Sequence, residues 1–273
     1  MRLRIAFSPC PNDTFVFHAL VHGRVAGAPE FEVTYADVDV TNTAAERGEF
    51  DLVKVSYAAL PWLLESYDLL PCGGALGRGC GPLVLARDAA SSIDGRHVAV
   101  PGERTTAYLL MRLWAADNPP ARVSVVPFAE IMPGVAAGRF DAGLVIHEAR
   151  FTYHRYGLHA AADLGEWWEA ETGLPIPLGA ILSRKGAVDP VSATSWIRQS
   201  VRNAWADPGA SRDYVLAHAQ EMELDVVDQH IALYVNEFTE DLGPGGYAAI
   251  DALLGRSAAA GLTPAVPVLN RSG

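Results

Sequence analysis

Short apolar runs alternate with amphipathic stretches along the first two thirds of the chain. The apolar runs are rich in β-branched residues, which is typical of buried strands, and the stretches between them have helical spacing. Because helices separate most of the runs, we expect largely parallel pairing with right-handed crossovers. The predicted strands are Leu3–Phe7, Phe31–Ala36, Leu52–Val55, Leu83–Ala86, His97–Val100, Val123–Pro127, Ala142–Ile146 and Leu178–Ser183.

Helices are predicted between these strands and beyond the last one. The predicted helix near Ala44 is preceded by Thr43 and contains Glu46, which together read as a capping box. Asn12 or Asp13 is expected to cap the helix that follows the first strand. The predicted ranges are Asp13–His22, Ala44–Arg47, Tyr57–Ser66, Ala107–Ala116, Ile131–Ala137 and most of 190–260, with breaks at Asp207 and Gly243.

The series of strands and helices starts twice, and no flexible linker separates the two series. We therefore expect an α/β protein of two lobes with a ligand cleft between them, by analogy with type II periplasmic-binding-protein-like folds. The first lobe is predicted to comprise residues 1–86 and 184–273, and the second residues 87–183. The crossover strands are expected near residues 83–86 and 178–183. A single doubly wound sheet is the alternative architecture.

The composition of the chain indicates which kinds of partner and which cellular compartment to expect. The formal net charge of −11 disfavours nucleic acid and anionic membranes, which bind clustered Lys and Arg. The apolar run Ile5–Phe7 is too short for a signal peptide, and no run approaches the ~20 residues of a membrane span. The three cysteines, an odd number without a C-x-x-C motif, indicate a reducing compartment. The protein is therefore expected to be cytoplasmic.

Four unusual segments follow predicted strands, where ligands of open parallel sheets bind. They are Ser8–Thr14 (SPCPNDT), Lys54–Tyr57 (KVSY), Pro101–Thr106 (PGERTT) and His147-Glu148. Because both predicted lobes contribute such segments, we expect them to meet around a small organic ligand.

An acidic protein can bind an anion if local donors offset its overall charge. Thr105, Thr106 and Ala107 begin a predicted helix, whose free amides and partial positive charge suit a carboxylate or phosphate. Ser56 offers the same possibility in the other lobe, and Lys54 is expected to form an ion pair at its strand end. Simple helix capping by Thr105 is the alternative reading.

His147 is delivered to the end of a buried apolar strand, where an imidazole can act as a general base near neutral pH. A structural histidine is the alternative. No metal site is expected, because the sequence after His147 lacks the second histidine of a zinc H-E-x-x-H motif. Cys10 is expected to be a buried, unreactive thiol. Tyr57, Phe151, Tyr153 and Tyr156 are candidates for an aromatic wall of the cleft.

The motifs SPCPNDTF from Ser8, KVSY from Lys54, G-x-x-T-T-A from Gly102 and LVIHE from Leu144 resemble the 1,4-dihydroxy-6-naphthoate synthases of the futalosine route to menaquinone. The resemblance implies a carbon–carbon lyase that converts cyclic dehypoxanthinylfutalosine, a small anionic substrate, without metal or organic cofactor. It implies His147 as general base. The expected substrate-binding residues are Pro11, Asn12, Lys54, Ser56, Tyr57, Thr105, Thr106 and Ala107.

Two other functions remain open from the sequence. A chorismate dehydratase of the same pathway is expected to share the fold, and the fold alone is equally typical of a non-catalytic protein that binds a small carboxylate. A homodimer is possible through the C-terminal helices.

Overall fold

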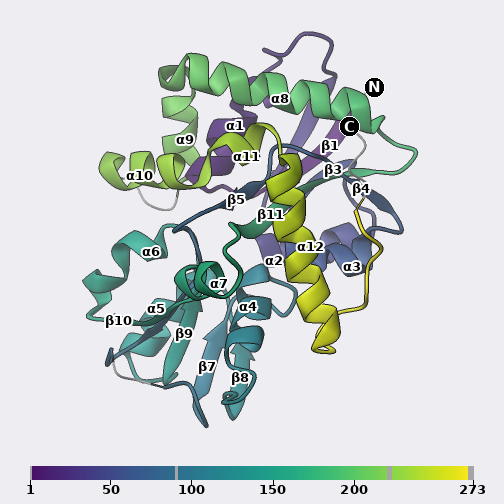
Figure 1. Ribbon diagram of the computed structural model, residues 1–273. Coiled ribbons are helices and arrows are strands. Elements are labelled where there is room, and N and C mark those ends of the chain that lie inside the picture. Colours follow the sequence, from purple (N-terminus) through teal and green to yellow (C-terminus); the bar gives the residue numbers. More distant parts are fainter. Residues whose placement is uncertain (1, 90–91, 220–222, 270–273) are drawn as a thin grey trace.

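Two separate β-sheets organise the chain, one in each lobe of the molecule (Figure 1). The structure, a computed structural model, describes residues 2–89, 92–219 and 223–269. The first sheet has the order β2 (Glu30–Tyr35), β1 (Arg2–Phe7), β3 (Leu52–Ser56), β11 (Ile176–Arg184) and β4 (Tyr67–Leu69), with β5 (Ala75–Gly77) also paired to β11. The second has the order β10 (His159–Asp163), β6 (Leu83–Ala86), β9 (Ala142–Val145), β7 (His97–Val100) and β8 (Arg122–Val125).

The parallel pairing predicted from the sequence holds for the strands that helices separate. In the first sheet β1 is parallel to β2 and β3, and in the second β7 is parallel to β8 and β9. The prediction is wrong for β6 and β11, which pair antiparallel with their neighbours. The existence of two sheets excludes the single doubly wound sheet, and the two-lobed fold is confirmed.

The two predicted crossover strands lie in different sheets. β6 belongs to the second sheet and β11 to the first, so each is hydrogen-bonded in the lobe opposite to the one assigned to it from the sequence. The lobe boundaries at residues 86 and 183 stay a prediction. The short strands β4, β5 and β10 were not predicted, since three to five residues of mixed polarity carry little periodic signal.

Helices cover both sheets. The α-helices are α1 (Pro11–Val21), α2 (Val38–Glu46), α3 (Leu60–Leu63), α4 (Thr106–Trp114), α5 (Phe128–Ala136), α6 (Ala149–Thr152), α7 (Leu164–Thr172), α8 (Pro190–Ala206), α9 (Arg212–His218), α10 (Leu224–Tyr234), α11 (Glu237–Glu240) and α12 (Gly243–Ala259). Helices α1, α4 and α8 begin within two residues of the predicted starts, whereas α6 and α7 were not predicted. Short 3₁₀ helices among the described residues are η1 (Tyr57–Ala59), η2 (Tyr153–Tyr156) and η3 (Pro208–Ser211). Across the described ranges, no helix is long and apolar enough to cross a membrane.

Two predicted helix caps are wrong. Helix α1 begins at Pro11, because proline needs no amide acceptor and its ring presets a helical φ, so Cys10 takes the cap position. Helix α2 begins at Val38, which places Thr43 inside the helix, where its hydroxyl donates to the Asp39 carbonyl at 3.0 Å. The extended backbone of Asp37 marks that earlier start.

A hydrophobic core shared by both lobes lies beneath α4, α7 and α12. It joins Val55 of the first sheet to Val84 of the second, with Leu110, Trp168 and Leu253 from the three helices. Helix α12, yellow in Figure 1, extends along β11 toward the second lobe. Two smaller clusters lie beneath α1 and α8 in the first lobe and beneath α5 in the second. The lobes are therefore packed together on one side, which fixes the distance between their strand ends.

Within the second lobe, the start of α7 packs closely against the segment before β6, where the backbones of Gly165 and Gly81 approach each other. A Cβ on Gly165 would lie 2.8 Å from the Cα of Gly81. We expect Gly165→Ala to lower the free energy of unfolding by about 1–3 kcal/mol, as overpacking does. Gly255 in α12 is a matched control with open space around its Cα, and Gly255→Ala should raise that free energy by about 0.5–1 kcal/mol. Urea unfolding measures both, and a Gly165→Ala variant as stable as the parent protein would contradict the packing.

Candidate active site

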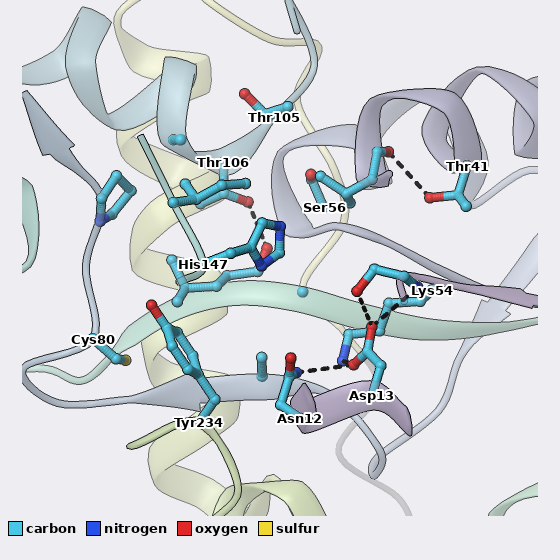
Figure 2. A pocket seen from close by; sticks show the side chains of 18 residues that line it. Asn12, Asp13, Thr41, Lys54, Ser56, Cys80, Thr105, Thr106, His147 and Tyr234 are labelled. Atoms are coloured by element: carbon cyan, nitrogen blue, oxygen red, sulfur yellow. Dashed lines mark hydrogen bonds and ion pairs between the residues drawn. The ribbon is translucent and has the colours of Figure 1, made fainter. Parts of the chain in front are cut away.

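A cavity opens between the carboxyl ends of the strands of the two lobes (Figure 2). It measures about 650 Å³ when the space open to solvent is included. The first lobe contributes Ser8, Asn12, Asp13, Lys54 and Ser56 to its wall, and the second contributes Thr105, Thr106, Ala107, Ile146 and His147. The structure thus brings together the four segments that the sequence placed at strand ends.

A buried ion pair forms the floor of the cavity on the side of the first lobe. Lys54 Nζ lies 2.5 Å from Asp13 Oδ1, and the two side chains are only 7% and 3% exposed. The same ammonium donates to the carbonyl of Gly73 at 3.3 Å. The other Asp13 oxygen accepts from the hydroxyl of Ser8 at 3.0 Å and from its amide at 3.3 Å. Asp13 therefore fastens the start of α1 to β3 and to the loop before the helix.

His230 of α10 extends this network from the C-terminal helices. The Asn12 amide nitrogen donates to Asp13 at 2.9 Å, so the Asn12 oxygen faces His230 and accepts from its Nε2 at 3.0 Å. His230 is fully buried, and its Nδ1 has no hydrogen-bond partner among the described residues. Burial, followed by the nearby His147 and Lys54, lowers the pKa of His230 well below its ordinary value. The ring is therefore neutral near pH 7.

His147 lies two residues after the end of β9 and faces the same network. Its backbone has a φ of 58°, the left-handed region that few non-glycine residues adopt. Its ring is nearly parallel to that of His230, with 6.4 Å between the ring centroids, and Phe128 packs against it edge-on. Burial lowers the pKa of His147 to about 4, with Asp13 opposing this shift and Lys54 adding to it. The imidazole is therefore neutral near pH 7 and has a free lone pair.

The hydroxyl groups at the start of α4 are engaged within the protein. Thr105 caps α4, since its Oγ1 accepts from the Tyr108 amide at 3.2 Å. The Thr106 hydroxyl donates to the Leu178 carbonyl at 2.8 Å and accepts from the Ala58 amide at 3.2 Å. These bonds connect α4 to β11 and η1. The donors that α4 presents to the cavity are consequently its first backbone amides, which have no acceptor within the helix.

Ser56 is held in a comparable way by Asn42 of α2. The Ser56 amide donates to the Asn42 side-chain oxygen at 2.8 Å, and the Asn42 nitrogen donates back to the Ser56 hydroxyl at 3.2 Å. The same nitrogen lies 3.3 Å from the carbonyl oxygen of Arg104, in the loop before α4. Asn42, which the sequence did not single out, therefore links the two lobes at the cavity.

Several predicted site residues lie away from the cavity. Pro11 begins α1 and Tyr57 is buried in the shared core, and neither lines the cavity wall. The predicted aromatic wall is also absent from the described lining, which Tyr57, Phe151, Tyr153 and Tyr156 do not join. The aromatic side chain that does face the cavity is Tyr234, from α10 (Figure 2). Tyr234 was not predicted, because the segment that forms α10 carries no recognisable motif.

Cys10 is buried beside the cavity, as the sequence predicts. Burial raises the pKa of its thiol well above the ordinary value, and the neighbouring Glu148 carboxylate adds to this effect. Its Sγ lies 3.7 Å from Glu148 Oε2. One ligand atom each from Cys10, His147 and Glu148 lies within 4.8 Å of the others. This is a group of metal-ligand types that the sequence spacing did not reveal.

The fold and the cavity between its lobes define a type II periplasmic-binding-protein-like protein. A solved alkanesulfonate-binding protein from Xanthomonas axonopodis pv. citri, 16% identical, shares this fold with a TM-score of 0.71 over 98% of this chain and 96% of its own. A solved protein from Archaeoglobus fulgidus is more similar, at 31% identity and a TM-score of 0.90, with 96% and 98% of the two chains covered.

Sequence comparison identifies the family. A family model described as menaquinone biosynthesis matches residues 3–259, so the chain belongs to that family. A 1,4-dihydroxy-6-naphthoate synthase from Streptomyces coelicolor is 65% identical over 97% of this chain and 95% of the relative. A synthase of the same name from Thermus thermophilus is 47% identical, with 97% of both chains covered. The resemblance seen in the motifs is confirmed, and the protein is an enzyme of menaquinone biosynthesis.

The buried pair of Lys54 and Asp13 makes a testable contribution to stability. Removing one partner of a buried ion pair leaves an uncompensated charge, so we expect Lys54→Met to lower the free energy of unfolding by about 3–5 kcal/mol. The double variant with Asp13→Asn should recover part of that loss. Glu130→Gln is the control, because Glu130 and Arg139 are about half exposed and such pairs contribute about 0–1 kcal/mol. A double-mutant cycle, with unfolding in urea, measures the coupling energy between Lys54 and Asp13. If the effects of the two substitutions simply add, the predicted coupling is refuted.

Proposed function

We propose that this enzyme is a carbon–carbon lyase that converts cyclic dehypoxanthinylfutalosine into 1,4-dihydroxy-6-naphthoate and a sugar-derived fragment. His147 is the general base, and no metal or organic cofactor takes part. The observation that carries the proposal is the neutral imidazole of His147 in the wall of the cavity between the lobes. The names of the two synthase relatives support the identity of the product.

The proposed chemistry needs a base, and it needs groups that stabilise the negative charge that develops on the substrate. In a retro-aldol step, the imidazole takes a proton from a substrate hydroxyl and a C=O bond forms at that carbon. The adjacent C–C bond breaks, and its electron pair enters the ring that becomes aromatic. The imidazolium then returns the proton to the product. Aromatisation favours the products, and donors held in a partly closed cavity stabilise developing charge better than water does.

Two groups at the cavity suit the negative charge of the substrate. The first amides of α4 point from a helix N-terminus, which favours a carboxylate. An ammonium has three N–H donors, and Asp13 and the Gly73 carbonyl accept two of those of Lys54. The remaining donor belongs to a residue that lines the cavity. This arrangement explains how an acidic protein can bind an anion without a basic surface patch.

Turnover of the cyclic substrate by purified protein tests the proposal directly. We expect the protein to release dihydroxynaphthoate with EDTA present throughout and no cofactor added. Chromatography with mass detection measures the product. Thermal stabilisation by the substrate without any turnover would instead indicate a binding protein. Conversion of chorismate by the same preparation would indicate the dehydratase.

The role of His147 is tested by His147→Asn, because asparagine tolerates a positive φ but cannot act as this base. We expect kcat to fall about 10²–10⁴-fold, the usual contribution of a general base, with the free energy of unfolding little changed. The control His154→Asn alters a histidine that does not line the cavity and should keep the parent rate. A fully active His147→Asn enzyme would refute the assignment.

The pH dependence of kcat/KM follows from the lowered pKa of His147. The imidazole accepts a proton only when it is neutral, which it is above pH about 4 in the folded protein. We therefore expect the acid limb of the profile to fall near pH 4, well below the 6.5 of an ordinary histidine. Steady-state rates between pH 3.5 and 8, each checked for retained fold by circular dichroism, measure it. An acid limb near 6.5 would contradict the described environment of the ring.

A further inference from the structure

Cys10, His147 and Glu148 form a compact set of metal-ligand groups beside the cavity. One ligand atom from each residue lies within 4.8 Å of the other two, and the Cys10 sulfur is 3.7 Å from a Glu148 oxygen. A thiolate, an imidazole and a carboxylate are the three ligand types that Zn²⁺ prefers in proteins. Three protein ligands with a fourth position open to water form the common arrangement of accessible zinc sites. His147 lines the cavity, which gives an ion a route to the group.

The backbone brings these groups together from distant parts of the chain. Cys10 lies in the loop after β1, whereas His147 and Glu148 follow β9. Side chains of adjacent residues in a strand point to opposite faces, but the left-handed φ of 58° at His147 turns the chain. Glu148 then adopts helical angles at the start of α6. The turn thus allows two consecutive side chains to approach the same sulfur atom.

The charges around the sulfur favour a cation. Besides burial, three carboxylates raise the pKa of the Cys10 thiol, namely those of Glu148, Asp13 and Asp37. A field that disfavours an isolated thiolate attracts a divalent ion, which displaces the thiol proton to solvent and binds the sulfur. Lys54, which lines the same cavity as His147, is itself paired with Asp13 at 2.5 Å. A nitrogen of the His147 ring lies within 4.8 Å of both the Cys10 sulfur and a Glu148 oxygen.

We propose that Cys10, His147 and Glu148 bind Zn²⁺, and that the bound ion inhibits the enzyme reversibly. The ion holds the imidazole lone pair that the proposed lyase reaction uses as a base. Its fourth ligand is a water molecule on the cavity side. The binding site stands independently of the reaction, whereas the inhibition rests on the proposed function.

Titration of the purified full chain with Co²⁺, without substrate, tests the site itself. Cobalt replaces zinc in such sites, and a bound thiolate adds a near-ultraviolet charge-transfer band to the visible bands of a four-coordinate ion. We expect both to saturate at one equivalent and to disappear when Zn²⁺ is added. Zn²⁺ should also raise Tm, because a ligand that binds only the folded state stabilises it, whereas Mg²⁺ should not. Absence of the charge-transfer band at excess cobalt would overturn the proposal, whatever any variant does.

Matched variants assign the ligands. Cys10→Ser should abolish the charge-transfer band. Glu148→Gln should weaken cobalt binding by at least about 10-fold, because losing even an outer-shell partner of a metal ligand costs about 10–100-fold. Cys72→Ser is the thiol control, because Cys72 is buried elsewhere, with its sulfur 3.7 Å from the Thr194 carbonyl. Circular dichroism establishes that each variant is folded. A band that survives in Cys10→Ser, or that is lost in Cys72→Ser, would place the ion elsewhere.

Turnover measurements test the inhibition separately. We expect Zn²⁺ to abolish dihydroxynaphthoate release, EDTA to restore it, and Cys10→Ser to need at least about 10-fold more Zn²⁺ for half inhibition. Cobalt binding with unchanged or increased turnover would overturn the inhibitory role. If the parent protein releases no naphthoate at all, the proposed function fails, while the cobalt spectrum still decides whether the site exists.

Discussion

The buried pair of Lys54 and Asp13 determines the geometry of the candidate active site. Lys54 belongs to the central strand β3, and Asp13 lies in the first turn of α1, so their 2.5 Å contact fixes that helix against the sheet. Through Asp13 the pair also holds Ser8 and Asn12. Asn12 in turn accepts from His230, which ties the C-terminal helix α10 to the cavity. Because each of these groups is buried, losing one partner would leave others unsatisfied.

The same pair also affects the pKa of the His147 imidazole. Lys54 lowers the pKa of the imidazole and Asp13 raises it, so the two effects oppose each other and burial decides the outcome. The ring is neutral at physiological pH and available as a base. Asp13 and the Gly73 carbonyl accept two of the three donors of the Lys54 ammonium, which leaves one donor on a residue that lines the cavity of a protein with net charge −11. Strong positive charge at the cavity is not needed when helix amides contribute.

The sequence predicted those parts of the site that follow strong local patterns. The strands β1, β3, β7 and β9 are mostly apolar, so the segments after them could be placed at the strand ends. The residues contributed by α10, His230 and Tyr234, could not be found, because no local pattern tells which distant helix packs against a cavity. The engagement of the Thr106 hydroxyl with Leu178 and the contact of Cys10 with Glu148 are likewise long-range. The left-handed backbone of His147 could not be predicted either, because the sequence before it is that of an ordinary apolar strand.

The central claim is that the cavity between the lobes holds the naphthoate product with His147 as its reacting partner. A crystal structure of the protein with 1,4-dihydroxy-6-naphthoate bound tests this most directly. The account predicts the product between β3 and the start of α4, with a ring nitrogen of His147 about 2.6–3.2 Å from a product oxygen, the reach of a general base. Product bound instead in the apolar hollow lined by Phe15, Trp205 and Ile231, remote from His147, would contradict it.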